Sequence, residues 1–96
     1  MSDNQYKIFE TDNFIKALNK LDKHIKQNLE KRLRDYIYPQ LRQEPHYGLN
    51  IKKLRNYSPD TWRYRLGKYR LFYAIEEDVK LIDILTIEIR QSAYCL

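Results

Sequence analysis

The sequence predicts an α+β fold in which two helices cover one face of a mainly antiparallel sheet. A short strand-like segment comes first, two amphipathic helical stretches follow, and three or four strand-like segments complete the chain. Two helices are enough to cover only one face of such a sheet, so the other face is left open. With 96 residues, the chain is expected to form one domain over residues 1–96.

The N-terminal half supplies the first strand and both helices. Residues 6–10 are expected to be extended, and they precede three residues that cap helix starts well: Thr11, Asp12 and Asn13. Apolar residues then recur at helical spacing through residue 21, and Asp22 can cap a second helix that continues to about residue 41. Pro39 lacks an N–H and crowds the preceding turn, so we expect a break or kink near Tyr38.

The strands lie in the C-terminal half. Residues 51–54 read as a short strand and residues 56–60 as a turn. Residues 79–89 form the most apolar segment, which predicts burial on both faces and a central position in the sheet.

Between these segments, residues 62–75 predict a hairpin that turns at Gly67-Lys68. Glycine first in a two-residue loop suits a type II′ turn. The resulting pairs are Leu66–Tyr69, Arg65–Arg70, Tyr64–Leu71 and Arg63–Phe72. Alternation then places the tyrosines, Trp62 and the leucines on the core side, while the arginines and Phe72 share the open side, where we expect Arg70 to be exposed.

The arginine side of the hairpin predicts an anion-binding surface. Directly opposed arginines repel, so a chain that keeps Arg65 opposite Arg70 has an anion to place there. A net charge of +5 and a pI near 9.3 favour an acidic partner, either nucleic acid or an acidic protein. Basic residues between positions 52 and 70 face only one acid, Asp60. We take the RNA-binding candidates to be Lys52, Lys53, Arg55, Arg63, Lys68 and, for base stacking, Phe72.

Composition also limits the cellular compartment and the cofactors that we expect. A lone Cys95 allows no disulfide within the chain, no N-terminal apolar run resembles a signal peptide, and no stretch has the length of a membrane span. We therefore expect a cytoplasmic protein. No metal-ligand spacing or phosphate-binding glycine loop is present, so no cofactor and no metal are expected.

Residues 51–55, 62–73 and 87–94 resemble the RelE/ParE superfamily of type II toxin–antitoxin toxins. The resemblance covers essentially the whole chain, and Arg90 followed four residues later by Tyr94 is similar to the RelE branch. That branch implies a toxin that cleaves mRNA in the ribosomal A site and is neutralised by an acidic antitoxin. Two alternatives stay open: a ParE-like gyrase poison without catalysis, and a decayed toxin that only binds antitoxin or nucleic acid.

The resemblance also implies a set of site residues. Arg63 and Arg65 fall where RelE-type toxins often have basic residues, Arg70 and Arg90 fall on arginines credited with stabilising phosphate and the transition state, and Tyr94 falls on the C-terminal tyrosine. The sequence departs from the family pattern at two positions: Glu88 replaces a usual glycine, and Ile89 stands where a polar residue is common.

Proton exchange is the part of this chemistry that arginine cannot perform, because arginine stays charged. Our first candidate is Tyr94, since nearby cations favour its phenolate and would lower its pKa. Glu88, His46 and Glu44 are the other candidates.

The register of the last strand decides where Glu88 lies. If the loop after Ile75 holds three residues, Arg70 pairs with Ile84, Glu88 lies on the arginine side and Asp83 faces the core. A longer loop or a bulge would reverse these faces.

Overall fold

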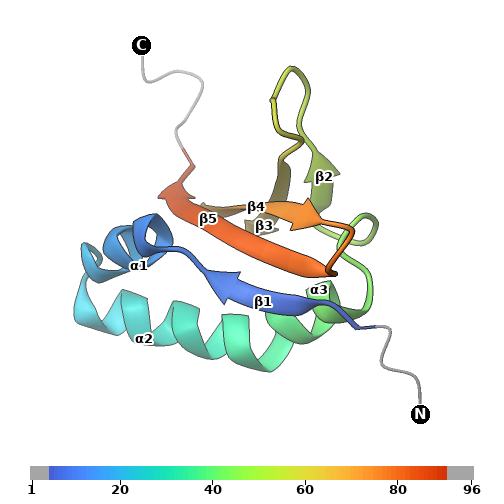
Figure 1. The fold of residues 1–96 in the computed structure, drawn as a ribbon. Helices are drawn as coiled ribbons and strands as arrows, with labels where there is room; N and C mark the ends of the chain where they lie inside the picture. The colour runs from blue at the N-terminus through green and yellow to red at the C-terminus, as the bar shows by residue number, and fades with distance from the viewer. Residues whose placement is uncertain (1–4, 91–96) are drawn as a thin grey trace.

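The computed structural model describes residues 5–90, which form a five-stranded sheet with all of its helices on one side (Figure 1). In chain order the elements are β1 (Lys7–Glu10), α1 (Asp12–Asn19), α2 (Lys23–Arg32), a π-helical turn (Leu33–Ile37), α3 (Tyr38–Gln43), β2 (Ile51–Lys53), β3 (Trp62–Leu66), β4 (Tyr69–Glu76) and β5 (Leu81–Ile89). The strand order is β1-β5-β4-β3-β2. Every neighbouring pair is antiparallel except β1 and β5, which are parallel. The predicted fold class is confirmed.

Both helix starts follow the predicted capping chemistry. The side chain of Thr11 accepts a hydrogen bond from the backbone N–H of Phe14, and the side chain of Asp22 accepts one from His24. Near Pro39 the helix widens into the π-helical turn, in which the backbone N–H of Tyr38 donates to the carbonyl of Leu33. The expected kink therefore takes the form of a wider turn, which accommodates the proline ring and lets the helix continue as α3.

The core lies between the helices and one face of the sheet. Its fully buried side chains come from both layers: Phe14, Leu29 and Leu41 from the helices, and Leu66, Leu71, Tyr73, Ile82 and Ile84 from the strands. Among the described residues no helix covers the opposite face of the sheet, which we call the open face.

The β3–β4 hairpin has the predicted register. Arg65 pairs with Arg70 and Arg63 pairs with Phe72, so the arginines point to the open face. Gly67 has φ +60°, as the first residue of a type II′ turn requires.

The register between β4 and β5 differs from the one expected for a three-residue loop. Glu76 pairs with Leu81, so the turn contains four residues, and a bulge at Leu85 shifts the pairing between Tyr73–Ile84 and Phe72–Thr86. The longer turn reverses the faces and the bulge reverses them again. As a result Asp83 lies opposite Ala74 on the open face, while Glu88 lies opposite Arg70 on that same face.

Strand β5 has the predicted interior position but is not buried on both sides. It lies between β1 and β4, and its buried residues are Ile82, Ile84 and Ile87. On the open face Leu85 and Thr86 are partly exposed and Glu88 is exposed, because no helix within residues 5–90 packs there.

Candidate functional site

Four arginines gather at the end of the open face next to the hairpin turn. Arg63 and Arg65 come from β3, Arg70 comes from β4, and Arg90 directly follows β5. Burial and then the charges of Arg65, Arg63 and Arg90 lower the pKa of Arg70. Arg65 lies directly opposite Arg70, and Arg63 lies two residues along β3 on the same face. Arg90 lines the same hollow as Arg70, and we call these four residues the arginine cluster.

Arg70 is held by the backbone of the turn. Its Nη1 donates to the carbonyl oxygens of Gly67 and Tyr69, both at 2.8 Å, and the residue is only 9% exposed. The expectation that Arg70 is exposed was therefore wrong. The side chain lies against the turn because two carbonyl oxygens there accept its hydrogen bonds.

The other arginines differ in exposure. Arg65 and Arg90 are exposed. The backbone N–H of Arg90 donates to the carbonyl of Lys68, which ties the end of β5 to the hairpin turn. The Nε of Arg63 is buried and has no hydrogen-bond partner among the described residues. A buried cationic N–H without a partner is unfavourable, and a bound anion would satisfy it.

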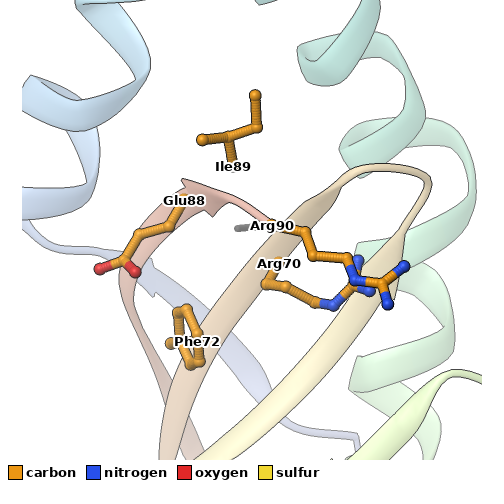
Figure 2. Close-up of a pocket in the computed structure, with 5 residues that line it drawn as sticks. All are labelled: Arg70, Phe72, Glu88, Ile89 and Arg90. Atoms are coloured by element: carbon orange, nitrogen blue, oxygen red, sulfur yellow. The ribbon is translucent and has the colours of Figure 1, made fainter. Parts of the chain in front are cut away.

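An open hollow of about 540 Å³, the arginine hollow, lies beside the cluster (Figure 2). Its lining residues are Arg70, Phe72, Glu88, Ile89 and Arg90. In Figure 2 the side chains of Arg70 and Arg90 extend to the same side, whereas the carboxylate of Glu88 points away from them. Glu88 forms no hydrogen bond or ion pair among residues 5–90. The hollow thus combines two cations, one aromatic ring and one free carboxylate.

A second hollow, of about 260 Å³, adjoins the first and shares Phe72 and Glu88 with it. The other residues lining it are Tyr57, Thr61, Leu85 and Thr86. Sequence reasoning did not find this hollow. Its walls come from the loop between β2 and β3 and from the bulge of β5, and neither leaves a periodic pattern in the sequence.

Not all of the predicted basic residues reach the arginine cluster. Lys52 pairs with Arg63 across the β2–β3 ladder, on the open face. Lys53 pairs with Trp62, forms a 3.3 Å ion pair with Asp60 and lies 5.5 Å from the centre of the Trp62 ring. Alternation along β2 places these two lysines on opposite faces.

Two further basic residues do not line the arginine hollow. The Nζ of Lys68 lies 5.9 Å from the centre of the Tyr69 ring, and Lys68 borders a hollow with residues of α2. Arg55 lies in the exposed turn after β2. The charge count along the sequence could not separate these positions, because it ignores the face to which each side chain points.

His46 and Glu44 lie at the other end of the sheet. The Nδ1 of His46 is 2.9 Å from a carboxylate oxygen of Glu44, its Nε2 contacts Glu77, and its ring packs edge-on against Trp62 with centroids 5.7 Å apart. Glu77 follows Glu76, which is six residues along β4 from Arg70, or roughly 20 Å at strand spacing. The ring of His46 packs on Trp62, whose side chain belongs to the core face, so His46 and Glu44 lie on the other side of the sheet from the arginine cluster. Tyr94 lies outside the described residues.

Residues 5–90 lack the features of two other classes of site. No helix there is long and apolar enough to cross a membrane. No group of three His, Cys, Asp or Glu side chains in this part of the chain is arranged to hold a metal ion.

Comparison with known proteins finds solved structures with the same fold and a protein family that matches the chain. The chain is similar over 90% of its length to the toxin–antitoxin complex RelBE2 from Mycobacterium tuberculosis, with 27% identity, a TM-score of 0.70 and 99% of that chain covered. It is similar over 93% of its length to the archaeal RelE–RelB complex from Pyrococcus horikoshii, with 27% identity, a TM-score of 0.69 and 99% of that chain covered. The isolated RelE toxin of E. coli shares the fold at 21% identity and a TM-score of 0.67, with 93% of this chain and 88% of that chain covered.

A search of curated proteins found no match. The family model that matches, over residues 8–94, describes the ParE toxin of the type II toxin–antitoxin system parDE. Its match covers nearly the whole chain, so this protein belongs to the RelE/ParE superfamily of type II toxin–antitoxin toxins.

Proposed function

We propose that this toxin is a ribosome-dependent endoribonuclease that cuts mRNA in the A site. The observation that carries the proposal is the arginine cluster beside an open hollow, on the face that the helices leave uncovered. Cations held together at such repulsive cost favour an anionic ligand, and a phosphate of RNA fits guanidinium groups bidentately.

The proposed reaction needs no metal, because the ribose 2′-OH supplies the nucleophile from within the substrate. Arg65, Arg70 and Arg90 stabilise the negative charge that develops on the attacked phosphate, and the hydrogen bonds of Arg70 to the turn keep one of these cations preorganised. Arg63 and Lys52 lie on the same face and bind neighbouring phosphates.

Proton exchange is assigned to Tyr94, with Glu88 as the alternative. Glu88 lines the hollow as a carboxylate without a partner among residues 5–90, which supports its place as the alternative. The position of His46 and Glu44 on the core side of the sheet removes both from the proposal. Lys53, Arg55 and Lys68 are likewise left out of the proposed contacts with the cleaved phosphate.

The proposed partner is an acidic antitoxin that acts in the cytoplasm. The similar M. tuberculosis and P. horikoshii toxins were solved in complexes with their antitoxins. An acidic segment that folds on binding would complement the open face and neutralise the arginine cluster.

A gyrase poison is the second candidate, because the matching family model is that of a ParE toxin. A gyrase poison binds a protein and transfers no proton. It would therefore make no use of a tyrosine or a carboxylate next to the arginines.

One experiment separates the two candidates. The toxin is induced in cells, message 5′ ends are mapped genome-wide, and gyrase-linked DNA breaks are counted in the same culture. We expect new ends within translated codons that vanish in Arg90→Ala and persist in Lys31→Ala, an exposed control on α2. DNA breaks without new message ends would overturn the nuclease and support the gyrase poison.

A further inference from the structure

We infer that the second hollow is a nucleobase subsite and that Glu88 makes it selective for guanine. The inference rests on the proposed function, because it places the RNA phosphate at the arginine cluster. It adds a specificity-determining residue and names the base that the site reads.

The two hollows are arranged to hold the two ends of one nucleotide. They share Phe72 and Glu88. Arg70 and Phe72 are two residues apart on the same face of β4, which separates them by roughly 7 Å. A nucleotide with its phosphate at Arg70 can therefore extend its ribose along the strand and bring its base to Phe72.

The walls of the second hollow suit a flat aromatic ligand. Phe72 and Leu85 are partly buried, and Tyr57 is 53% exposed on the opposite loop. Unpaired bases are recognised in proteins by stacking on such rings.

The polar groups of the second hollow favour hydrogen-bond donors on the base. The hydroxyl of Thr61 donates to the carbonyl of Pro59 at 3.1 Å, so it has only lone pairs to offer a ligand. The carboxylate of Glu88 only accepts hydrogen bonds when ionised, and it points away from the arginines (Figure 2). The two carboxylate oxygens of Glu88 and the hydroxyl oxygen of Thr61 thus give this small hollow three hydrogen-bond acceptors.

Guanine matches these acceptors best among the four bases. Its N1–H and N2–H₂ groups are adjacent and can both donate to one carboxylate. Uracil has a single ring N–H, and adenine and cytosine each have one amino group beside a ring nitrogen that only accepts. A bidentate pair of this kind discriminates against the wrong base by roughly 5- to 150-fold.

The test is an NMR titration of the full chain with guanosine monophosphate, uridine monophosphate and inorganic phosphate. We expect the guanosine nucleotide to shift the amide signals of Thr86 and Glu88 and to bind roughly 5- to 150-fold more tightly than the uridine nucleotide. Phosphate alone should shift only signals near the arginine cluster. In Glu88→Gln the preference for guanosine should fall several-fold, while Asp78→Asn, which removes the same charge in the distant β4–β5 turn, should keep it.

Equal affinities for the two nucleotides, or an unchanged preference in Glu88→Gln, would overturn the inference. Mapping cut sites for wild type and Glu88→Gln in cells separates this failure from failure of the proposed function. Cleavage with the same base preference in both proteins defeats the subsite alone. Selective guanosine binding in a toxin that leaves messages intact supports the subsite and defeats the nuclease.

Discussion

Arg70 stabilises the hairpin turn in addition to its proposed role in anion binding. Its two hydrogen bonds to the carbonyls of Gly67 and Tyr69 join a charged donor to neutral acceptors, and such bonds contribute about 1.5–3 kcal/mol. Repulsion from Arg63, Arg65 and Arg90 offsets part of this. We predict that Arg70→Ala abolishes growth inhibition and also lowers the free energy of unfolding by about 1–2 kcal/mol, measured by urea denaturation.

Arg65→Ala is the matched control for this prediction. Arg65 belongs to the same cluster but is exposed, and its removal relieves repulsion across the ladder. Its free energy of unfolding should stay within about 0.5 kcal/mol of wild type. If Arg70→Ala were as stable as Arg65→Ala, the hydrogen bonds of Arg70 to the turn would not contribute to stability.

Tyr94 carries the prediction about proton transfer. Tyr94→Phe keeps the ring and removes only the hydroxyl, so ribosome binding should persist. Single-turnover cleavage should fall by roughly 10²- to 10⁴-fold, the usual contribution of a general acid or base. Cleavage at the wild-type rate would transfer the role to Glu88, and Glu88→Gln would then slow cleavage at every codon irrespective of the base.

Elements differ in how well the sequence predicts them. The hairpin register was predictable because a two-residue turn fixes it locally, and the helix starts were predictable because Thr11 and Asp22 act through neighbouring backbone N–H groups. The register of β5 was not predictable. It depends on one extra turn residue and one bulge residue, each of which inverts the faces of the strand. The position of His46 on the core side of the sheet depends on how the elements pack together, which no local pattern encodes.

The loop after α3 is joined to the β4–β5 turn by a pH-sensitive contact. Burial alone would lower the pKa of His46, but hydrogen bonds and charge from Glu77 and Glu44 outweigh burial and raise it. The pKa values of Glu44 and Glu77 are lowered, chiefly by His46. Protonated His46 therefore stabilises the fold fully below about pH 6.5, the pKa in the unfolded chain, and this contribution is lost as pH rises through the higher folded value. The carboxylate contribution is present above about pH 4.3 and is lost on acidification.

We predict that wild type loses about 1 kcal/mol of unfolding free energy relative to His46→Gln between pH 6 and pH 9. The carboxylates are about half exposed, with side-chain exposures of 52% and 53%, so the effect stays near that of a surface pair. Urea denaturation at both pH values measures it. His24→Gln, on an exposed position of α2, should follow the wild-type pH dependence, and identical curves for all three proteins would exclude the contact as a stabilising element.

At the scale of the whole molecule, the two faces of the sheet differ in what packs against them. One face of the sheet packs against the helices to build the core, and no helix of residues 5–90 covers the other face (Figure 1). The arginine cluster lies on that open face. A basic face without a covering layer is suited to an acidic partner, so the proposed antitoxin should bind there.

We predict that antitoxin binding weakens by roughly tenfold or more between 0.1 and 0.5 M NaCl, because exposed charges are screened at these concentrations. Surface plasmon resonance should show slower association for a combined Arg63→Gln and Arg65→Gln variant. A variant with Lys20→Gln and Lys31→Gln removes the same charge from the exposed helical side and should associate normally. If the helix variant were the slower one, the antitoxin would dock on the helices instead.

The hydrogen bond from the backbone N–H of Arg90 to the carbonyl of Lys68 anchors the end of β5 to the hairpin turn. Four residues span at most roughly 14 Å, so this anchor keeps Tyr94 within that radius of the point where β5 ends, beside Arg70. A group on so short a tether has an effective concentration in the millimolar range or above. On the proposal that Tyr94 exchanges the proton, a peptide that carries this tyrosine and is added to a truncated toxin would have to reach millimolar concentration to replace it.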